Sequence, residues 1–103
     1  MIYTLTIRPE AEADLRESYQ WYEARGEGLG SSFFVTVEAT LNSIHRHPQA
    51  YPKVFRNVRR ALTRRFPFGI FYVVRRKKIV VFAVFHAKRD PSAWKSRYAD
   101  LSD

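Results

Sequence analysis

Residues 59–91, RRALTRRFPFGIFYVVRRKKIVVFAVFHAKRDP, hold the longest apolar runs of the chain and most of its basic charge. The runs 68–74 (FGIFYVV) and 79–85 (IVVFAVF) are rich in β-branched and aromatic residues, and their length and composition are typical of strands rather than helices. Four cations at 75–78 separate them and form a charged turn. The two runs therefore predict an antiparallel hairpin in the middle of a sheet, and residues 58–66 predict a third strand beside it.

Cations occur on both sides of this predicted third strand. Alternation along residues 58–66 places Arg60 and Arg64 on one side and Arg59 and Arg65 on the other. Burying an arginine without an ionic partner is costly. We therefore expect one surface of the sheet to stay exposed, with cations over it, and helices to cover only the opposite face.

Two helices are predicted between a first strand and this sheet. Residues 2–8 alternate apolar and polar side chains as a half-buried strand does, and Pro9 suits the first turn of a helix. Two apolar stripes then repeat at helical spacing: Ala11, Leu15, Tyr19 and Tyr22 in the first, and Phe34, Val37, Leu41 and Ile44 in the second. The acidic residues of the first helix are expected on a solvated outer face.

The remaining segments complete an α+β fold. Residues 48–57 contain two prolines and no clear period, so they predict a connector. Pro91 and Ser92 predict the start of a short final helix that carries Trp94. We expect a helical hairpin packed on one face of a small, mostly antiparallel four-stranded sheet, in the order strand, helix, helix, three strands, short helix. Residues 1–103 are expected to form one domain.

The charge of the chain is large and uneven. The formal net charge is +8. Residues 1–45 carry three arginines against seven acidic residues, whereas residues 46–103 carry fifteen lysines and arginines against three acidic residues. A basic excess gathered in one part of the chain favours an anionic partner, such as a nucleic acid or an acidic protein.

The sequence argues against several other classes of protein. Without cysteine there is no disulfide or thiolate metal site, and the chain suits a reducing cytosol. The three histidines lack a cysteine or acidic partner at ligand spacing, so neither a metal nor another cofactor is expected. The glycines within 26–30 lie between helices, whereas a phosphate-binding loop follows a strand. Neither helix pairs an apolar stripe with a basic face, so membrane binding is not expected.

Two stretches resemble patterns of the RelE/ParE superfamily, the toxins of type II toxin–antitoxin modules. Residues 64–72, RRFPFGIFY, resemble the R-F-P-Y-x-I-x-Y strand of that family, and residues 81–94, VFAVFHAKRDPSAW, resemble its V-x-A-V-x-H-x-x-R-x-P-x-x-W ending. Residues 3–15, with Pro9, fit its first strand and helix. The resemblance covers nearly the whole chain and implies the same fold.

This resemblance implies a small cytoplasmic toxin that a cognate antitoxin neutralises within a hetero-oligomer. Two activities occur on this fold: ParE-like toxins inhibit DNA gyrase, and RelE-like toxins cut messenger RNA on the ribosome. The fold alone does not choose between them. An inactive relative that only binds an antitoxin is a third possibility.

The residues for ribonuclease chemistry are only partly present. Metal-independent RNA cleavage needs a general base, a general acid and cations that stabilise the pentacovalent phosphate. Arg65 and Arg89 fit the cation role, and His86 fits the acid or base role. The position of His86 favours a structural role instead, as a strand-end histidine bonded to the backbone of the next loop. No carboxylate lies near the basic strand in the sequence. This set favours the ParE-like branch; if the chain is an enzyme, we expect a metal-independent endoribonuclease.

Two groups of candidate binding residues follow. The candidate contacts with the target are cations of the third strand and of the loop after the last strand: Arg59, Arg60, Arg64, Arg65, Lys88 and Arg89. The candidate contacts with the antitoxin are aromatic: Tyr22, Phe34 and Trp94. We expect the gap between the helical hairpin and the sheet to accept an antitoxin helix or an added strand.

Overall fold

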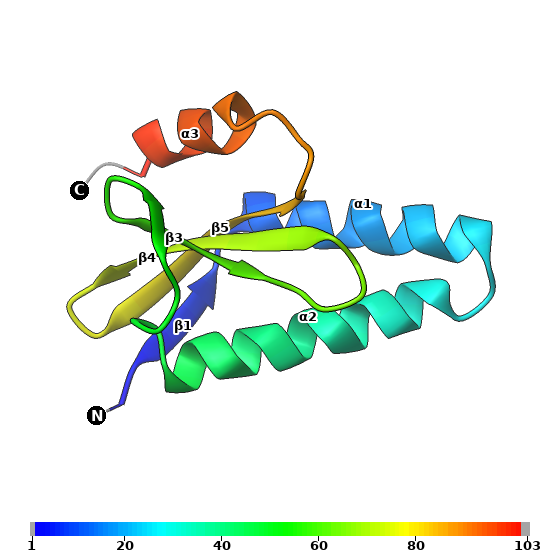
Figure 1. The fold of residues 1–103 in the computed structure, drawn as a ribbon, viewed down its shortest axis with the longest axis horizontal. Coiled ribbons are helices and arrows are strands. Elements are labelled where there is room, and N and C mark those ends of the chain that lie inside the picture. The colour runs from blue at the N-terminus through cyan, green and yellow to red at the C-terminus, as the bar shows by residue number, and fades with distance from the viewer. Residues whose placement is uncertain (1, 102–103) are drawn as a thin grey trace.

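The computed structural model describes residues 2–101 and shows one sheet with helices on both of its faces (Figure 1). In chain order the elements are β1 (Thr4–Ile7), α1 (Pro9–Arg25), α2 (Leu29–Arg46), β2 (Lys53–Phe55), β3 (Val58–Leu62), β4 (Phe68–Arg75), β5 (Lys78–His86) and α3 (Ser92–Ala99). The predicted order of elements is confirmed, with one added strand. No helix within residues 2–101 is both long and apolar enough to cross a membrane.

The sheet has five strands in the order β1-β5-β4-β3-β2. β1 pairs with β5 in parallel, with Thr4 opposite Lys78, and the other pairs are antiparallel. The prediction of a mostly antiparallel sheet is confirmed, but the predicted number of four strands is wrong. The fifth strand, β2, lies in the segment 48–57 that was predicted as a connector. Its three residues are too few to show a period of two.

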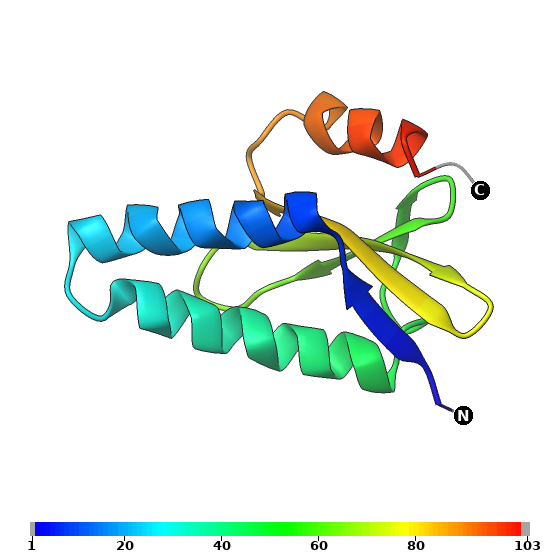
Figure 2. The ribbon, with the colours of Figure 1, turned by 180° about the vertical axis from the view of Figure 1, so that it is seen from behind.

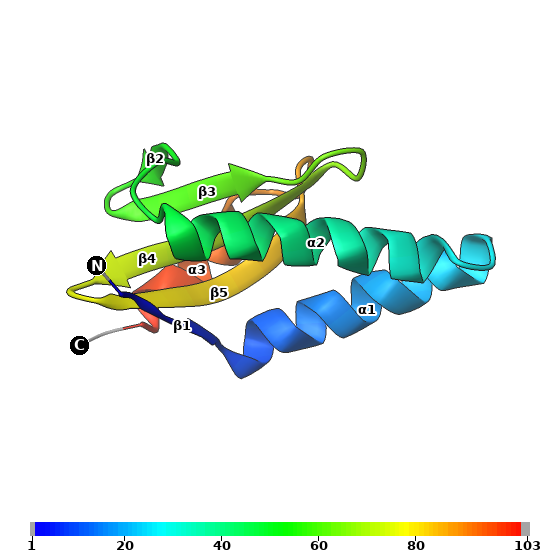
Figure 3. The same ribbon diagram turned by 90° about the horizontal axis from the view of Figure 1, so that it is seen from below.

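The helices α1 and α2 form an antiparallel hairpin over one face of the sheet (Figure 3). They approach closely at Gly30, where a Cβ atom would lie 2.9 Å from the carbonyl oxygen of Tyr19. Between hairpin and sheet lies a core of buried side chains: Ala11, Leu15, Phe33, Val37, Ile44, Ala61, Phe66, Phe68, Ile70, Tyr72, Ile79, Val81 and Val84. This core fills the gap in which an antitoxin segment was expected.

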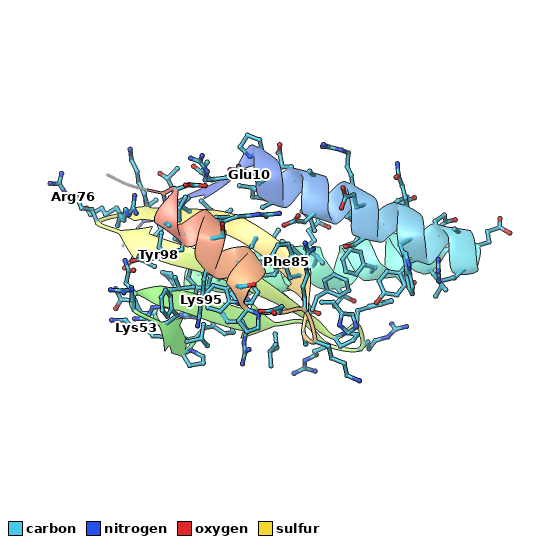
Figure 4. All side chains as sticks on the ribbon, turned by 90° about the horizontal axis from the view of Figure 1, so that it is seen from above. Glu10, Lys53, Arg76, Phe85, Lys95 and Tyr98 are labelled. Carbon is cyan, nitrogen blue, oxygen red and sulfur yellow. The ribbon has the colours of Figure 1, made fainter. Side chains whose placement is uncertain are left out.

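The short helix α3 packs on the opposite face of the sheet (Figure 4). Trp94 is 6% exposed and stacks on Phe71 of β4, with ring centroids 4.6 Å apart and ring planes at 23°. Phe82 and Phe85 of β5 lie in the same buried cluster. The prediction that helices cover only one face is therefore wrong. The central strands are apolar on both faces, and both faces need cover from water.

A bulge in β5 joins the two sides of the molecule. Phe82 is an extra residue in the register between β4 and β5. Its carbonyl accepts a hydrogen bond from Arg97 of α3 at 3.0 Å, and the N–H of Val84 donates to Asp14 of α1 at 2.9 Å. Asp14 is only 8% exposed, so the expected solvated position is wrong for this acidic residue. Its carboxylate is buried because the bulge supplies a backbone donor.

The two ends of the sheet have different connections (Figure 2). The tight turns 56–57 and 76–77 lie at one end, which we name the turn end. The loops 63–67 and 87–91 lie at the other end, which we name the loop end. The strand predicted over 58–66 stops at Leu62, so its last residues belong to the loop end.

Candidate target-binding surface

Two loops meet at the loop end and carry four exposed cations. Residues 63–67 join β3 to β4, and residues 87–91 join β5 to α3. The N–H of Ala87 donates to the carbonyl of Pro67 at 2.6 Å, which holds the loops together. The exposed cations are Arg64, Arg65, Lys88 and Arg89. The structure thus brings together the two loops that carry four of the six side chains predicted to contact a target.

Thr63 orders the first loop from inside. It is 9% exposed, and its hydroxyl donates to the Phe66 carbonyl while its N–H donates to the Phe68 carbonyl at 2.9 Å. Arg65 has a φ of 70°, in the left-handed region that is uncommon for residues with a Cβ atom. These bonds divert the chain from the path of β3. The two arginines of this loop therefore extend into solvent.

His86 orders the second loop. Its Nδ1 accepts a hydrogen bond from the N–H of Lys88 at 3.1 Å, and its ring meets Phe68 edge-on at 5.5 Å between centroids. Because Nδ1 accepts, the neutral imidazole carries its proton on Nε2. This is the structural role considered for His86 from its position at a strand end.

The second loop also holds a cation over an aromatic ring. The guanidinium carbon of Arg89 lies 4.1 Å from the ring centroid of Phe85. One residue later, the Asp90 carboxylate accepts the N–H of Ser92 at 2.8 Å. This backbone hydrogen bond lowers the pKa of Asp90 below its usual value. The loop therefore enters α3 in a fixed conformation, with Arg89 at its surface.

The other two predicted target contacts lie elsewhere. Arg59 is half-buried, and its Nη1 donates to the carbonyls of Gln49 and Tyr51 at 3.2 and 2.6 Å, so it supports the connector before β2. Arg60 lies on the α3 side of the sheet with its aliphatic part against Gly69, and its buried Nε makes no hydrogen bond within the described chain. Neither residue belongs to the exposed loops of the loop end.

A cleft of about 310 Å³ opens between α1 and the loop end. Its lining includes Trp21, His86 and Arg89, together with the carboxylates of Asp14 and Glu17. The cleft thus places carboxylates beside Arg89 of the second loop, and none of the arginines within 59–65 lines it. Of the four loop-end cations, Arg89 lines this cleft, where it lies among aromatic and acidic groups.

The sequence of α1 did contain a signal for the inward position of Asp14. Asp14 and Ser18 follow Ala11 at intervals of three and four, and Tyr22 follows at four more, so all four lie on the face toward the sheet. This signal is weaker than that of the neighbouring apolar stripe, because a charged residue beside such a stripe is usually solvated.

The three aromatic candidates for antitoxin binding lie in three places. Trp94 is buried under α3, and Tyr22 is half-buried among core rings, 4.8 Å from Phe66 between centroids. Phe34 of α2 is 46% exposed. Only Phe34 offers substantial surface to a partner.

A groove of about 410 Å³ lies between α2 and the end of β3. Val35 and Leu62 line it and are 64% and 55% exposed, which is high for branched apolar residues. Arg64 and Arg65 form its basic rim. The pairing of β2 with β3 ends at Arg59, so within the described chain the later part of β3 has no strand on that side. The groove combines apolar surface, an open strand edge and positive charge.

Two solved structures have folds similar to that of this chain. A chain of the chromosomal ParDE TA system from P. aeruginosa matches with a TM-score of 0.76 and 19% identity, covering 84% of this chain and 98% of that one. The isolated E. coli RelE toxin matches with a TM-score of 0.63 and 16% identity, covering 96% and 99%. No curated protein sequence matches this chain. The fold is that of the RelE/ParE superfamily.

The family follows from the sequence itself. The family model described as "ParE toxin of type II toxin-antitoxin system, parDE" matches residues 5–91, from β1 to the loop before α3. The chain therefore belongs to the ParE toxin family, and the resemblance seen in its two sequence patterns is confirmed. Among residues 2–101, no three His, Cys, Asp or Glu side chains are placed to hold a metal ion.

Proposed function

We propose that this toxin inhibits DNA gyrase by binding it through the loop end, without a chemical reaction of its own. The four cations there are exposed, and the two loops that carry them are ordered by Thr63 and His86. Ordered arginines beside exposed aromatic surface are typical of protein interfaces. Membership of the ParE family supports the same reading.

The hydrogen bond of His86 is the observation that favours binding over catalysis. A general base needs a free ring nitrogen, but Nδ1 already accepts the Lys88 N–H and Nε2 then carries the proton. The hydrogen bond thus uses His86 to hold the second loop, which is a structural role.

A supercoiling assay tests this proposal. Purified toxin in stoichiometric excess should block the conversion of relaxed plasmid to supercoiled plasmid by gyrase. Relaxation of the same plasmid by an unrelated topoisomerase should continue, which excludes simple masking of DNA. Normal supercoiling at excess toxin would rule the proposal out.

Ribosome-dependent RNA cleavage is the second candidate, and the cleft is what favours it. Glu17, His86 and Arg89 all line it, so a carboxylate, an imidazole and a guanidinium lie in one space. If the toxin is a ribonuclease, His86→Gln should abolish toxicity in growing cells. Full toxicity of that variant would support the binding mechanism, and absence of toxicity in the unchanged protein would indicate an inactive relative.

We also infer that a cognate antitoxin binds the groove between α2 and β3. An acidic segment with apolar side chains fits the exposed Val35 and Leu62 and the basic rim, and it can add a strand to the open edge of β3. Leu62→Asp should weaken the complex by repelling such a segment, whereas the exposed Leu29→Asp serves as a matched control. Equal binding by both variants would place the antitoxin elsewhere.

A further inference from the structure

The turn end of the sheet carries a second, purely basic surface. Two segments form it: residues 53–59 (KVFRNVR) and residues 75–78 (RRKK). The register brings them together, because Arg59 pairs with Tyr72 of β4 and Arg75 pairs with Lys78 across the next turn. Both turns have a left-handed arginine, with φ of 52° at Arg56 and 59° at Arg76. The segments contain seven cations and no acidic residue: Lys53, Arg56, Arg59, Arg75, Arg76, Lys77 and Lys78.

A small polar cavity lies inside this surface. It has a volume of about 210 Å³ and is lined by Gln49, Lys53, Asn57, Arg59, Val74 and Arg76. Lys53 and Arg76 are exposed and lie at the same end of the molecule (Figure 4). The Asn57 side-chain oxygen accepts a hydrogen bond from the Tyr98 hydroxyl at 2.6 Å, and the amide nitrogen of the same side chain is a hydrogen-bond donor. The cavity thus offers cationic and neutral donors to an anionic oxygen.

The boundary of this surface is also defined. Arg75 donates to the carbonyl of Leu101 at 2.8 Å, so the end of α3 and the neighbouring Asp100 limit it on one side. On the opposite side, the start of β1 lies beside Lys78. Between these limits the exposed charged residues of the two segments 53–59 and 75–78 are all basic.

The chemistry of this surface fits phosphates better than a protein. Specific protein interfaces have an apolar centre that supplies most of the binding energy. The large apolar side chains exposed in the described chain are Ile2, Trp21, Leu29, Phe34, Val35 and Leu62, and none belongs to the two segments. A nucleic-acid backbone is instead bound by cations and amide donors, and both are present here. At the loop end, by contrast, Arg64 and Arg65 line a groove together with the exposed Val35 and Leu62. At the turn end the large exposed apolar neighbour is Ile2, just before β1, whose Thr4 lies opposite Lys78.

We propose that the turn end binds the phosphate backbone of nucleic acid, without reading its sequence. No side chain here is placed like a groove-reading element, so affinity is expected to depend on salt rather than on sequence. This inference does not depend on the gyrase proposal. A toxin with both surfaces can hold nucleic acid at one end and a protein at the other.

The test compares two double variants of equal charge. Lys53→Gln/Arg76→Gln removes two cations from the cavity, and Arg16→Gln/Arg25→Gln removes two exposed cations from α1. Fluorescence anisotropy follows a labelled short DNA duplex of arbitrary sequence from about 50 to 200 mM salt. Thermal melts establish that both variants are folded.

The unchanged protein should bind the duplex with a steep salt dependence. The turn-end variant should bind about tenfold more weakly, and its log–log salt slope should be shallower by about 2, since each lost phosphate contact removes about 0.9. The α1 variant should keep the original slope. Equal losses in both variants would show that only net charge matters, and absence of binding at low salt would also overturn the proposal. Displacement of the duplex by polyglutamate at matched charge would assign the surface to an acidic protein instead.

Discussion

The carboxylate of Asp14 and the guanidinium of Arg97 form a two-bond ion pair across 83 residues of sequence. The two bonds, from Nη1 to Oδ2 and from Nη2 to Oδ1, are 2.7 and 2.9 Å long. Both side chains also bond the bulge of β5, Asp14 through the Val84 N–H and Arg97 through the Phe82 carbonyl. The bonds to Asp14 raise the pKa of Arg97 above its ordinary value. One ion pair therefore joins α1, α3 and the sheet.

Asp14→Asn should lower the free energy of unfolding by about 2 to 3 kcal/mol. The change leaves Arg97 without its ionic partner in a mostly buried position, but Arg97 is 25% exposed, so water relieves part of the cost. Chemical denaturation measures this loss. The matched control is the exposed pair of Arg8 and Glu10, separated by 3.6 Å, where Glu10→Gln should cost less than about 1 kcal/mol. Equal losses of unfolding free energy in the two variants would mean that the pair of Asp14 and Arg97 stabilises the fold no more than the exposed pair does.

Trp94→Ala should destabilise the protein by about 3 to 5 kcal/mol, because it removes the ring stacked on Phe71 and leaves a cavity under α3. Trp21→Ala is the matched control. Trp21 is 52% exposed and contacts the guanidinium of Arg25 at 3.5 Å, so its loss should cost about 1 kcal/mol. Thermal melts of the two variants separate these effects. A small loss for Trp94→Ala would show that α3 is not part of the core.

Tyr72 should make stability fall at high pH. It is fully buried, its hydroxyl donates to the Pro48 carbonyl at 2.6 Å, and burial raises its pKa from 10.0 to about 12. The folded protein thus keeps this proton to higher pH than the unfolded chain does. Its contribution is complete below pH 10 and is lost as pH rises toward 12.

Tyr72→Phe isolates that titration. The variant should lose about 1 kcal/mol near neutral pH, because the Pro48 carbonyl loses its donor. The stability difference between the two proteins should then shrink or reverse between pH 10 and 12. Denaturation curves across this range provide the measurement, and parallel pH profiles would contradict the assigned cause.

Thr63→Val tests whether the first loop must be ordered for activity. The variant removes the hydroxyl that bonds the Phe66 carbonyl and should cost about 1 to 2 kcal/mol of stability. It should also weaken gyrase inhibition although Arg64 and Arg65 are unchanged. The exposed Thr6→Val in β1 is a control for side-chain type. Full gyrase inhibition by Thr63→Val would show that Arg64 and Arg65 act without an ordered loop.

The sequence predicted the central part of the fold because its signals are long and local. The runs 68–74 and 79–85 are apolar and β-branched, and they form β4 and β5 almost as predicted. β2 was not predicted, because its three residues are too few to show the alternation of a strand. The alternation beyond Leu62 continues into the loop, and only the bonds of Thr63 end the strand there.

The candidate site was harder to predict, since its groups meet through tertiary contacts. The loops that carry Arg65 and Arg89 meet because Ala87 bonds Pro67 across the sheet end, which no spacing reveals. Arg59 looked equivalent to them in the sequence, yet its partners are carbonyls of the connector. Asp14 is buried where it accepts the N–H of Val84, next to the bulge of β5. The continuous apolar run 79–85 contains no sequence signal for that bulge.

Binding of purified gyrase, free of DNA, to the toxin tests the central proposal most directly. The loop-end variant Arg65→Gln/Arg89→Gln is compared by calorimetry with Arg16→Gln/Arg46→Gln, which removes the same charge from exposed positions of the helical hairpin. The loop-end variant should bind about tenfold or more weakly, while the control keeps the affinity of the unchanged protein. Unchanged affinity of the loop-end variant, or absence of any binding by the unchanged protein, would contradict the proposal.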